Sequence, residues 1–250
     1  MPAEPLLLAL VGAVFVLAGF VKGVVGLGLP TVAIGLLSLV MAPAEAAALL
    51  ILPSLVTNIW QLLAGPSLGA LVRRLGAMMA CVAAGTLLAA GVIQSGSAWP
   101  QGALGVALSA YAALGLAAWR PAVPARAEPF ASPLVGLATG LVTGATGVFV
   151  IPAVPYLAAL GLKKEELIQA LGLSFTVSTL ALGAGLAGGG TLDPAAAGAS
   201  LLAVAPALVG MLAGGWLRGR VSEAAFRRVF FLGLLLLGAY LLARATLRAG

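Results

Sequence analysis

An apolar stretch that cannot form one straight helix, residues 19–35 (GFVKGVVGLGLPTVAIG), constrains the fold of this chain more than any other feature. Gly26 and Gly28 weaken a helix, and Pro30 removes a backbone hydrogen-bond donor. Lys22 stands at the edge of this weak point. The stretch is nevertheless apolar enough to lie in a membrane, so it predicts a membrane-embedded helix that is interrupted.

A second stretch of the same kind occupies residues 136–155 (GLATGLVTGATGVFVIPAVP). Glycines again precede two prolines, Pro152 and Pro155, and two threonines lie between the glycines. Broken apolar segments in corresponding positions of two halves are the pattern that marks the binding site of a transporter. The candidate site residues in the two breaks are Gly26, Gly28, Thr143, Gly144, Thr146 and Gly147.

The composition excludes most soluble classes of protein. Of the 250 residues 62% are hydrophobic and only 8% are charged, whereas a soluble domain carries roughly 25% charged residues. The chain has no His and a single cysteine, Cys81, so His-based metal sites, Ser–His catalysis and intrachain disulfides are excluded. We therefore predict no enzyme, no metal, no cofactor and no nucleic-acid partner. No basic region precedes the first apolar run, so we expect this segment to be retained rather than cleaved as a signal peptide.

The most polar stretch of the chain, residues 120–132 (RPAVPARAEPFAS), is predicted to link two halves. This places a first transmembrane repeat at residues 1–119 and a second at residues 133–250. Each repeat opens with a broken or re-entrant helix pair and contains about four transmembrane helices, because a span needs about 20 apolar residues. The predicted fold is an all-α polytopic membrane protein.

The distribution of charge indicates how the halves are oriented. If each broken segment crosses and returns, eight basic residues fall on one side of the membrane, and Glu45, residues 94–97 and Asp193 fall on the other. The positive-inside rule favours this arrangement, which makes the halves inverted repeats. Two residues near the C-terminus, Arg244 and Arg248, disagree with it. The eight are Arg73, Arg74, Arg120, Arg126, Lys163, Lys164, Arg218 and Arg220.

A polar pair recurs in both halves at an offset of 120 residues. Ser54 and Asn58 correspond to Ser174 and Ser178, and each pair is spaced i, i+4 on one helical face. Counted from Glu45, the first pair lies roughly 13 and 20 Å along its helix at 1.5 Å per residue, close to the midplane of a hydrocarbon core about 30 Å thick. We predict that these four side chains bind the substrate in one cavity at mid-depth.

Structural interpretations stand beside each of these predictions. Ser and Thr in membrane helices often bond only the carbonyl four residues back, and Asn58 could bridge two helices. The glycines could serve only close packing. If they instead form the site, Gly28→Leu and Gly144→Leu should abolish transport with little loss of folded protein. We expect Lys22 to extend toward the membrane interface, and Glu165 and Glu166 to form a solvated first helical turn.

The sequence resembles the sulfite exporter TauE/SafE family over residues 12–240. The segments that carry the resemblance are the two broken stretches and two further ones, PAEAAALLILPSLVTNIWQ and KKEELIQALGLSFTVSTLALG. The family pattern is commonly a GxGGG-like run before a proline. Here Leu29–Pro30 and Val148–Phe149 stand where more glycine is usual. The resemblance implies a multi-pass permease of the bacterial or archaeal inner membrane that handles sulfite, organosulfonates or related anions.

Together these observations predict a secondary transporter, and more specifically an exporter, of a small sulfur-containing anion by alternating access. An inside-negative potential favours export of an anion by about 2.3 kcal/mol per charge per 100 mV. Besides the anion and membrane lipids, the sequence leaves open an oligomer and coupling to H⁺ or Na⁺. The alternative function is that of a non-transporting structural or assembly subunit of a membrane complex.

Overall fold

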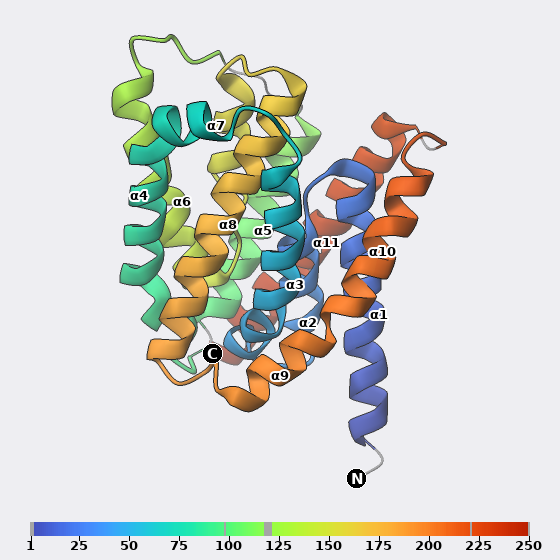
Figure 1. The fold of residues 1–250 in the computed structure, drawn as a ribbon. Helices are drawn as coiled ribbons and strands as arrows, with labels where there is room; N and C mark the ends of the chain where they lie inside the picture. Colours follow the sequence, from blue (N-terminus) through green and yellow to red (C-terminus); the bar gives the residue numbers. More distant parts are fainter. Residues whose placement is uncertain (1–2, 98, 118–121, 221, 250) are drawn as a thin grey trace.

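A computed structural model describes residues 3–97, 99–117, 122–220 and 222–249. Within these ranges the regular elements are all helices, and six helical segments, one of which joins α9 and α10, are long and apolar enough to cross a membrane. The predicted all-α membrane fold is therefore confirmed (Figure 1). The helices are α1 (Ala3–Val25), α2 (Leu29–Leu37), α3 (Pro43–Leu63), α4 (Leu68–Ile93), α5 (Trp99–Leu116), α6 (Glu128–Thr146), α7 (Ala153–Ala159), α8 (Lys164–Gly188), α9 (Pro194–Leu202), α10 (Val204–Leu217) and α11 (Glu223–Ala249).

Helices from the first half pair with helices from the second. The most extensive contacts join α1 to α10, α4 to α6, α5 to α11 and α3 to α8. In Figure 1, α3 and α8 lie at the front of the bundle and the α1–α10 pair stands to one side of it. The core is thus built between the halves rather than within each half.

Glycines allow two of these pairs to approach until their backbones touch. On α1, a methyl group added at Gly23 would collide with the backbone of Met211 in α10. On α6, one added at Gly140 would collide with the carbonyl of Val82 in α4. Small residues at a helix interface let membrane helices pack closely where no hydrophobic force drives them together.

The ends of the bundle differ in charge. At one end Arg74 pairs with Glu128 at 2.6 Å. At the same end, the side chain of Gln169 accepts the N–H of Ser67 and donates to the carbonyl of Gly65. The α3–α4, α5–α6 and α7–α8 connections therefore lie together. Figure 1 shows the α10–α11 connection at the same, upper end. The predicted group of basic residues therefore shares this end, except Arg120, which lies outside the described residues.

At the opposite end the α8–α9 turn meets the end of α4, where Thr191 donates a hydrogen bond to Gln94. Glu45 and Asp193 each cap a helix start there: the Glu45 carboxylate accepts the N–H of Ala42, and the Asp193 carboxylate accepts that of Ala196. Arg244 also lies at this end, near Leu39. The charge separation matches the sequence prediction, including the disagreement of Arg244.

The ends of three elements affect where the charges and the spans lie. Helix α4 begins at Leu68, so Arg73 and Arg74 lie within its first two turns. Helix α6 begins at Glu128, so residues 128–132 of the predicted linker are helical. The span from Pro194 to Leu217 is divided at Ala203, because Pro206 has no N–H to offer the carbonyl of Leu202.

Candidate functional site

The first break lies where the sequence predicted it. Helix α1 ends at Val25 and α2 begins at Leu29. Gly26 and Gly28 adopt φ values of +83° and +106°, which residues with a Cβ rarely adopt. The turn places Gly28 beside Val21, so α2 folds back along α1 and buries nearly all of its residues.

The second break also lies inside the stretch that the sequence predicted, residues 136–155. Helix α6 continues through Gly144 and ends at Thr146, and Gly147 caps it with a φ of +72°. Thr146 donates its hydroxyl to the carbonyl of Val142 and accepts the N–H of Val148. Thr143 donates to the carbonyl of Thr139. Thr143 Oγ1 also lies 3.3 Å from the carbonyl oxygen of Val148, so the hydroxyls of both threonines bond the backbone of Val148 in this break.

The glycines that bound the two breaks contact different neighbours rather than each other. Gly28 lies beside Phe230 of α11, whereas Gly147 packs on Ile34 of α2. Gly144 faces α4, where an added methyl group would collide with the carbonyl of Thr86. For Gly144 the contacts are those of close packing, while Gly26 has open space around it apart from the tip of Arg218.

Lys22 is buried, which corrects the expectation that it extends to the interface. Only 4% of its surface is exposed. Its ammonium group donates hydrogen bonds to Thr57 Oγ1, at 3.1 Å, and to Asn58 Oδ1. The reason is geometric, because the break folds α2 back over α1 and α3 supplies two polar acceptors at that depth. An ammonium has three N–H donors, and the third has no partner among the described residues.

Asn58 connects Lys22 to the second half. Its amide nitrogen donates to Thr179 Oγ1 of α8 at 3.3 Å, and Thr179 in turn donates to the carbonyl of Phe175 at 2.6 Å. A line of hydrogen bonds therefore runs from α1 through α3 to α8. We call Lys22, Thr57, Asn58 and Thr179 the central cluster.

The four residues predicted to bind substrate all lie in the α3–α8 layer, and each is completely buried. Among the residues that the structure describes, the hydroxyls of Ser54, Ser174 and Ser178 have no hydrogen-bond partner. Ser54 lies one turn before Asn58 on α3, and Ser174 and Ser178 share α8 with Thr179, so these hydroxyls belong to the two helices that supply three of the four residues of the central cluster. Burying an unpaired hydroxyl costs free energy, about 1–3 kcal/mol from mutational data.

Sequence reasoning overlooked the role of Lys22 and of the two threonines in the central cluster. Thr57 and Thr179 border the predicted polar faces, which was a usable signal. Lys22 gave a weaker one: it is a lone cation well inside a long apolar run, and an ionisable residue at such a place is functional by default.

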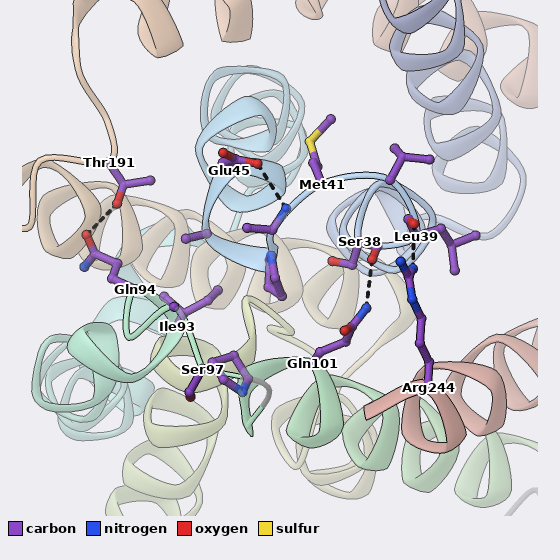
Figure 2. Close-up of a pocket in the computed structure, with 16 residues that line it drawn as sticks. Ser38, Leu39, Met41, Glu45, Ile93, Gln94, Ser97, Gln101, Thr191 and Arg244 are labelled. Atoms are coloured by element: carbon purple, nitrogen blue, oxygen red, sulfur yellow. Dashed lines mark hydrogen bonds between the residues drawn. The ribbon is translucent and has the colours of Figure 1, made fainter. Parts of the chain in front are cut away.

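A cleft of about 680 Å³ lies at the end of the bundle opposite the main basic group. We call it the end cleft. Arg244 and Gln101 reach the C-terminal end of α2 there, donating to the carbonyls of Leu39 at 2.6 Å and Ser38 at 3.1 Å (Figure 2). None of the four predicted binding residues lines this cleft. Its polar lining includes Ser38, Glu45, Gln94, Gln101, Thr191 and Arg244.

The described residues contain no group of three His, Cys, Asp or Glu side chains that could hold a metal ion. Their one ion pair joins Arg74 to Glu128 at the basic end. Neither Lys22 nor Arg244 has a carboxylate partner in these ranges. The described interior therefore holds the positive charge of Lys22 without a carboxylate partner, together with buried hydroxyl groups.

Comparison with known proteins identifies the family of this chain. The family model described as sulfite exporter TauE/SafE matches residues 11–241, which is nearly the whole chain. Neither the curated proteins nor the solved structures that were searched give a match. The chain therefore belongs to the sulfite exporter TauE/SafE family, a family of multi-pass membrane transporters for anions of the sulfite type.

Proposed function

We propose that this protein is a secondary transporter that exports a small sulfur-containing anion, sulfite or an organosulfonate, across the plasma membrane of a bacterium or archaeon. The observation that carries the proposal is the buried ammonium of Lys22, which has a spare N–H and no carboxylate partner among the described residues. A buried cation without a counterion is costly. An anion that enters the site would supply the missing charge.

The substrate site would consist of Lys22 and the neutral donors around it. Ser54, Asn58, Ser174 and Ser178 would contribute hydroxyl and amide groups, with the first break, at Gly26 and Gly28, closing one side of the site. Hydrogen bonds to a charged partner contribute roughly 1.5–3 kcal/mol each. One ammonium and a few hydroxyls give moderate affinity, which suits a carrier that must release its substrate. Thr143, Gly144, Thr146 and Gly147 would support the site from the second break.

Export follows from the sign of the charge. An inside-negative membrane potential expels an anion with about 2.3 kcal/mol per charge per 100 mV. The described carboxylates Glu45, Glu128 and Asp193 lie near helix starts at the two ends of the bundle. Glu165 and Glu166 likewise lie in the first turn of α8, and none of the five is hydrogen-bonded to the central cluster. A membrane potential alone would then be a sufficient driving force.

Alternating access would come from two inverted repeats, residues 1–119 and 133–250, that rock about the α3–α8 interface. The exchange of helices between halves supports this arrangement, because α1 packs on α10 while α4 packs on α6. Cysteines placed at Arg74 and Arg220 should be labelled from the cytoplasm, and one at Ser97 from the other side. Labelling of Arg74→Cys and Arg220→Cys from opposite sides would contradict the inverted repeat.

Counterflow in proteoliposomes tests the function directly. Vesicles loaded with sulfite should accumulate radiolabelled sulfite, and a panel of sulfate, thiosulfate, sulfonates and carboxylates should compete in the order of their affinities. The transported anion should also raise the melting temperature of the purified protein, because it binds only the folded state. A structural subunit of a complex would show neither effect, and that result would overturn the proposal.

A further inference from the structure

The end cleft contains donors that the proposed transport site does not use. Arg244 lies in the last part of α11, a helix that provides no residue of the central cluster. One of its N–H groups binds the carbonyl of Leu39. A guanidinium carries five N–H donors in a rigid plane, so several remain for a further partner.

Ser38 provides a second, independent observation. It lines the same cleft, only 1% of its surface is exposed, and its hydroxyl has no hydrogen-bond partner in the described part of the chain. Its backbone carbonyl already accepts a hydrogen bond from Gln101, and the neighbouring carbonyl of Leu39 accepts one from Arg244. Donors thus cap the negative end of α2, and the hydroxyl of Ser38 beside it remains without a hydrogen-bond partner in the described part of the chain.

The other polar groups of the lining are mostly occupied. The amide of Gln94 binds the carbonyls of Ala90 and Gly185, and its oxygen accepts the hydroxyl of Thr191. The Glu45 carboxylate lies across the cleft from Arg244 (Figure 2) and caps the start of α3 through Ala42. Its negative charge offsets the positive end of that helix.

We propose that the end cleft is a second anion site, in which Arg244 and Ser38 bind a small oxyanion at the mouth of the bundle opposite the main basic group. The bidentate geometry of a guanidinium matches the paired oxygens of a sulfonate, sulfite or sulfate group. The site does not depend on transport through the central cluster. Its role is to concentrate oxyanions at an end of the bundle that otherwise has few cations.

The test uses the full chain in nanodiscs of phosphatidylcholine, so that no anionic lipid competes. Cys81 is the lone cysteine, and Cys81→Ser provides a background in which Ser97→Cys places one thiol in the lining of the cleft. The rates of modification by a sulfonate-bearing and a trimethylammonium-bearing methanethiosulfonate reagent are measured. The ratio of the two rates reports the preference of the cleft for anions.

The expected result has two parts. Arg244→Gln should lower this ratio about fivefold, because the positive charge beside the thiol is lost. Arg228→Gln, the same change at an exposed position near the other end of α11, should leave it unchanged. Sodium sulfate should slow modification by the sulfonate reagent more than sodium chloride does at equal ionic strength, since chloride screens charge without matching the guanidinium fork.

Arg244→Lys separates binding from charge and also guards against a failure of Arg244→Gln to fold. It should keep the preference for the anionic reagent and lose the extra protection by sulfate. If sulfate and chloride protect the thiol equally in the protein that retains Arg244, the proposal of an anion site fails. Arg244 then serves only to cap α2. The same conclusion would follow if Arg244→Gln, folded by size-exclusion chromatography, kept the original ratio. If added phosphatidylglycerol removes the sulfate protection, the cleft prefers a lipid headgroup and the free-anion proposal fails.

Discussion

The two broken segments stand at corresponding places in the two halves, but they are built differently. The first has two glycines in the left-handed region, open space at Gly26, and a buried cation one turn earlier. In the second, the hydroxyls of Thr143 and Thr146 bond the carbonyl and the N–H of Val148, just after the end of α6. At the offset of 120 residues, Val142 stands where the first half has Lys22.

This difference shows that two copies of one sequence pattern can have different structural roles. Beside the first break, the charged side chain of Lys22 is buried. In the second, threonine hydroxyls bond the backbone of Val148, and Gly144 packs on α4. Because the site contains one ammonium rather than two, a bound anion would lie off the axis between the halves. Substitutions in the two breaks and in the α3–α8 layer test this division of roles.

The largest effect should come from Gly144→Leu in the second break. Its side chain would meet the backbone of Thr86 and Ala89, which cannot move aside, so α4 and α6 should separate and little folded protein should remain. Gly26→Leu meets open space and suffers only the left-handed backbone, about 1–2 kcal/mol. Size-exclusion chromatography and melting temperature compare the two. Equal yields of folded protein would contradict the packing role of Gly144, and this expectation replaces the one drawn from sequence.

Lys22→Met should reduce transport roughly 100-fold, because charge-assisted bonds to the anion are the strongest that the site can make. The variant should melt at the same or a higher temperature, since a buried unpaired charge is removed. Counterflow and thermal unfolding are measured on the same preparation. Val142→Met is the matched control in the second half and should transport normally. Full activity of Lys22→Met would exclude Lys22 from the substrate site.

Asn58→Leu should weaken anion binding about tenfold and Ser174→Ala about threefold, following the roughly 1 kcal/mol net value of a hydrogen bond. The asparagine change removes two donors and an acceptor and leaves Lys22 with Thr57 alone. Isothermal titration calorimetry with sulfite compares the two variants. Should Asn58→Leu bind as tightly as the parent, Asn58 is only a bridge to α8.

The smallest effect is expected for Thr146→Val, whose hydroxyl serves the second break. Transport should stay within about twofold of the parent, while stability falls by about 1 kcal/mol because the N–H of Val148 loses its acceptor. Transport assays and chemical unfolding in detergent separate the two readouts. A tenfold loss of transport at unchanged stability would place Thr146 in contact with the substrate and remove the contrast between the breaks.

The sequence pattern predicted which residues share a helical face, but it did not predict which distant residues they bind. The i, i+4 spacing correctly predicted that Ser54 and Asn58 share a buried face, because helix geometry is local. It did not predict that Asn58 binds Lys22, 36 residues away along the chain. Nor did it show that Ser200 of α9 would bond the carbonyl of Leu49, which Pro53 leaves without its usual donor in α3.

The sequence by itself determined what depends on a few neighbouring residues. The apolar composition requires a membrane fold, and Gly26, Gly28 and Pro30 interrupt a helix wherever that helix is placed, because their backbone restrictions are intrinsic. What each polar group meets depends on the tertiary structure. Lys22 could have reached the interface, but it is buried against Thr57 of α3. Arg244 could have stood in solvent, but it binds the carbonyl of Leu39, which the folding back of α2 brings to the end cleft.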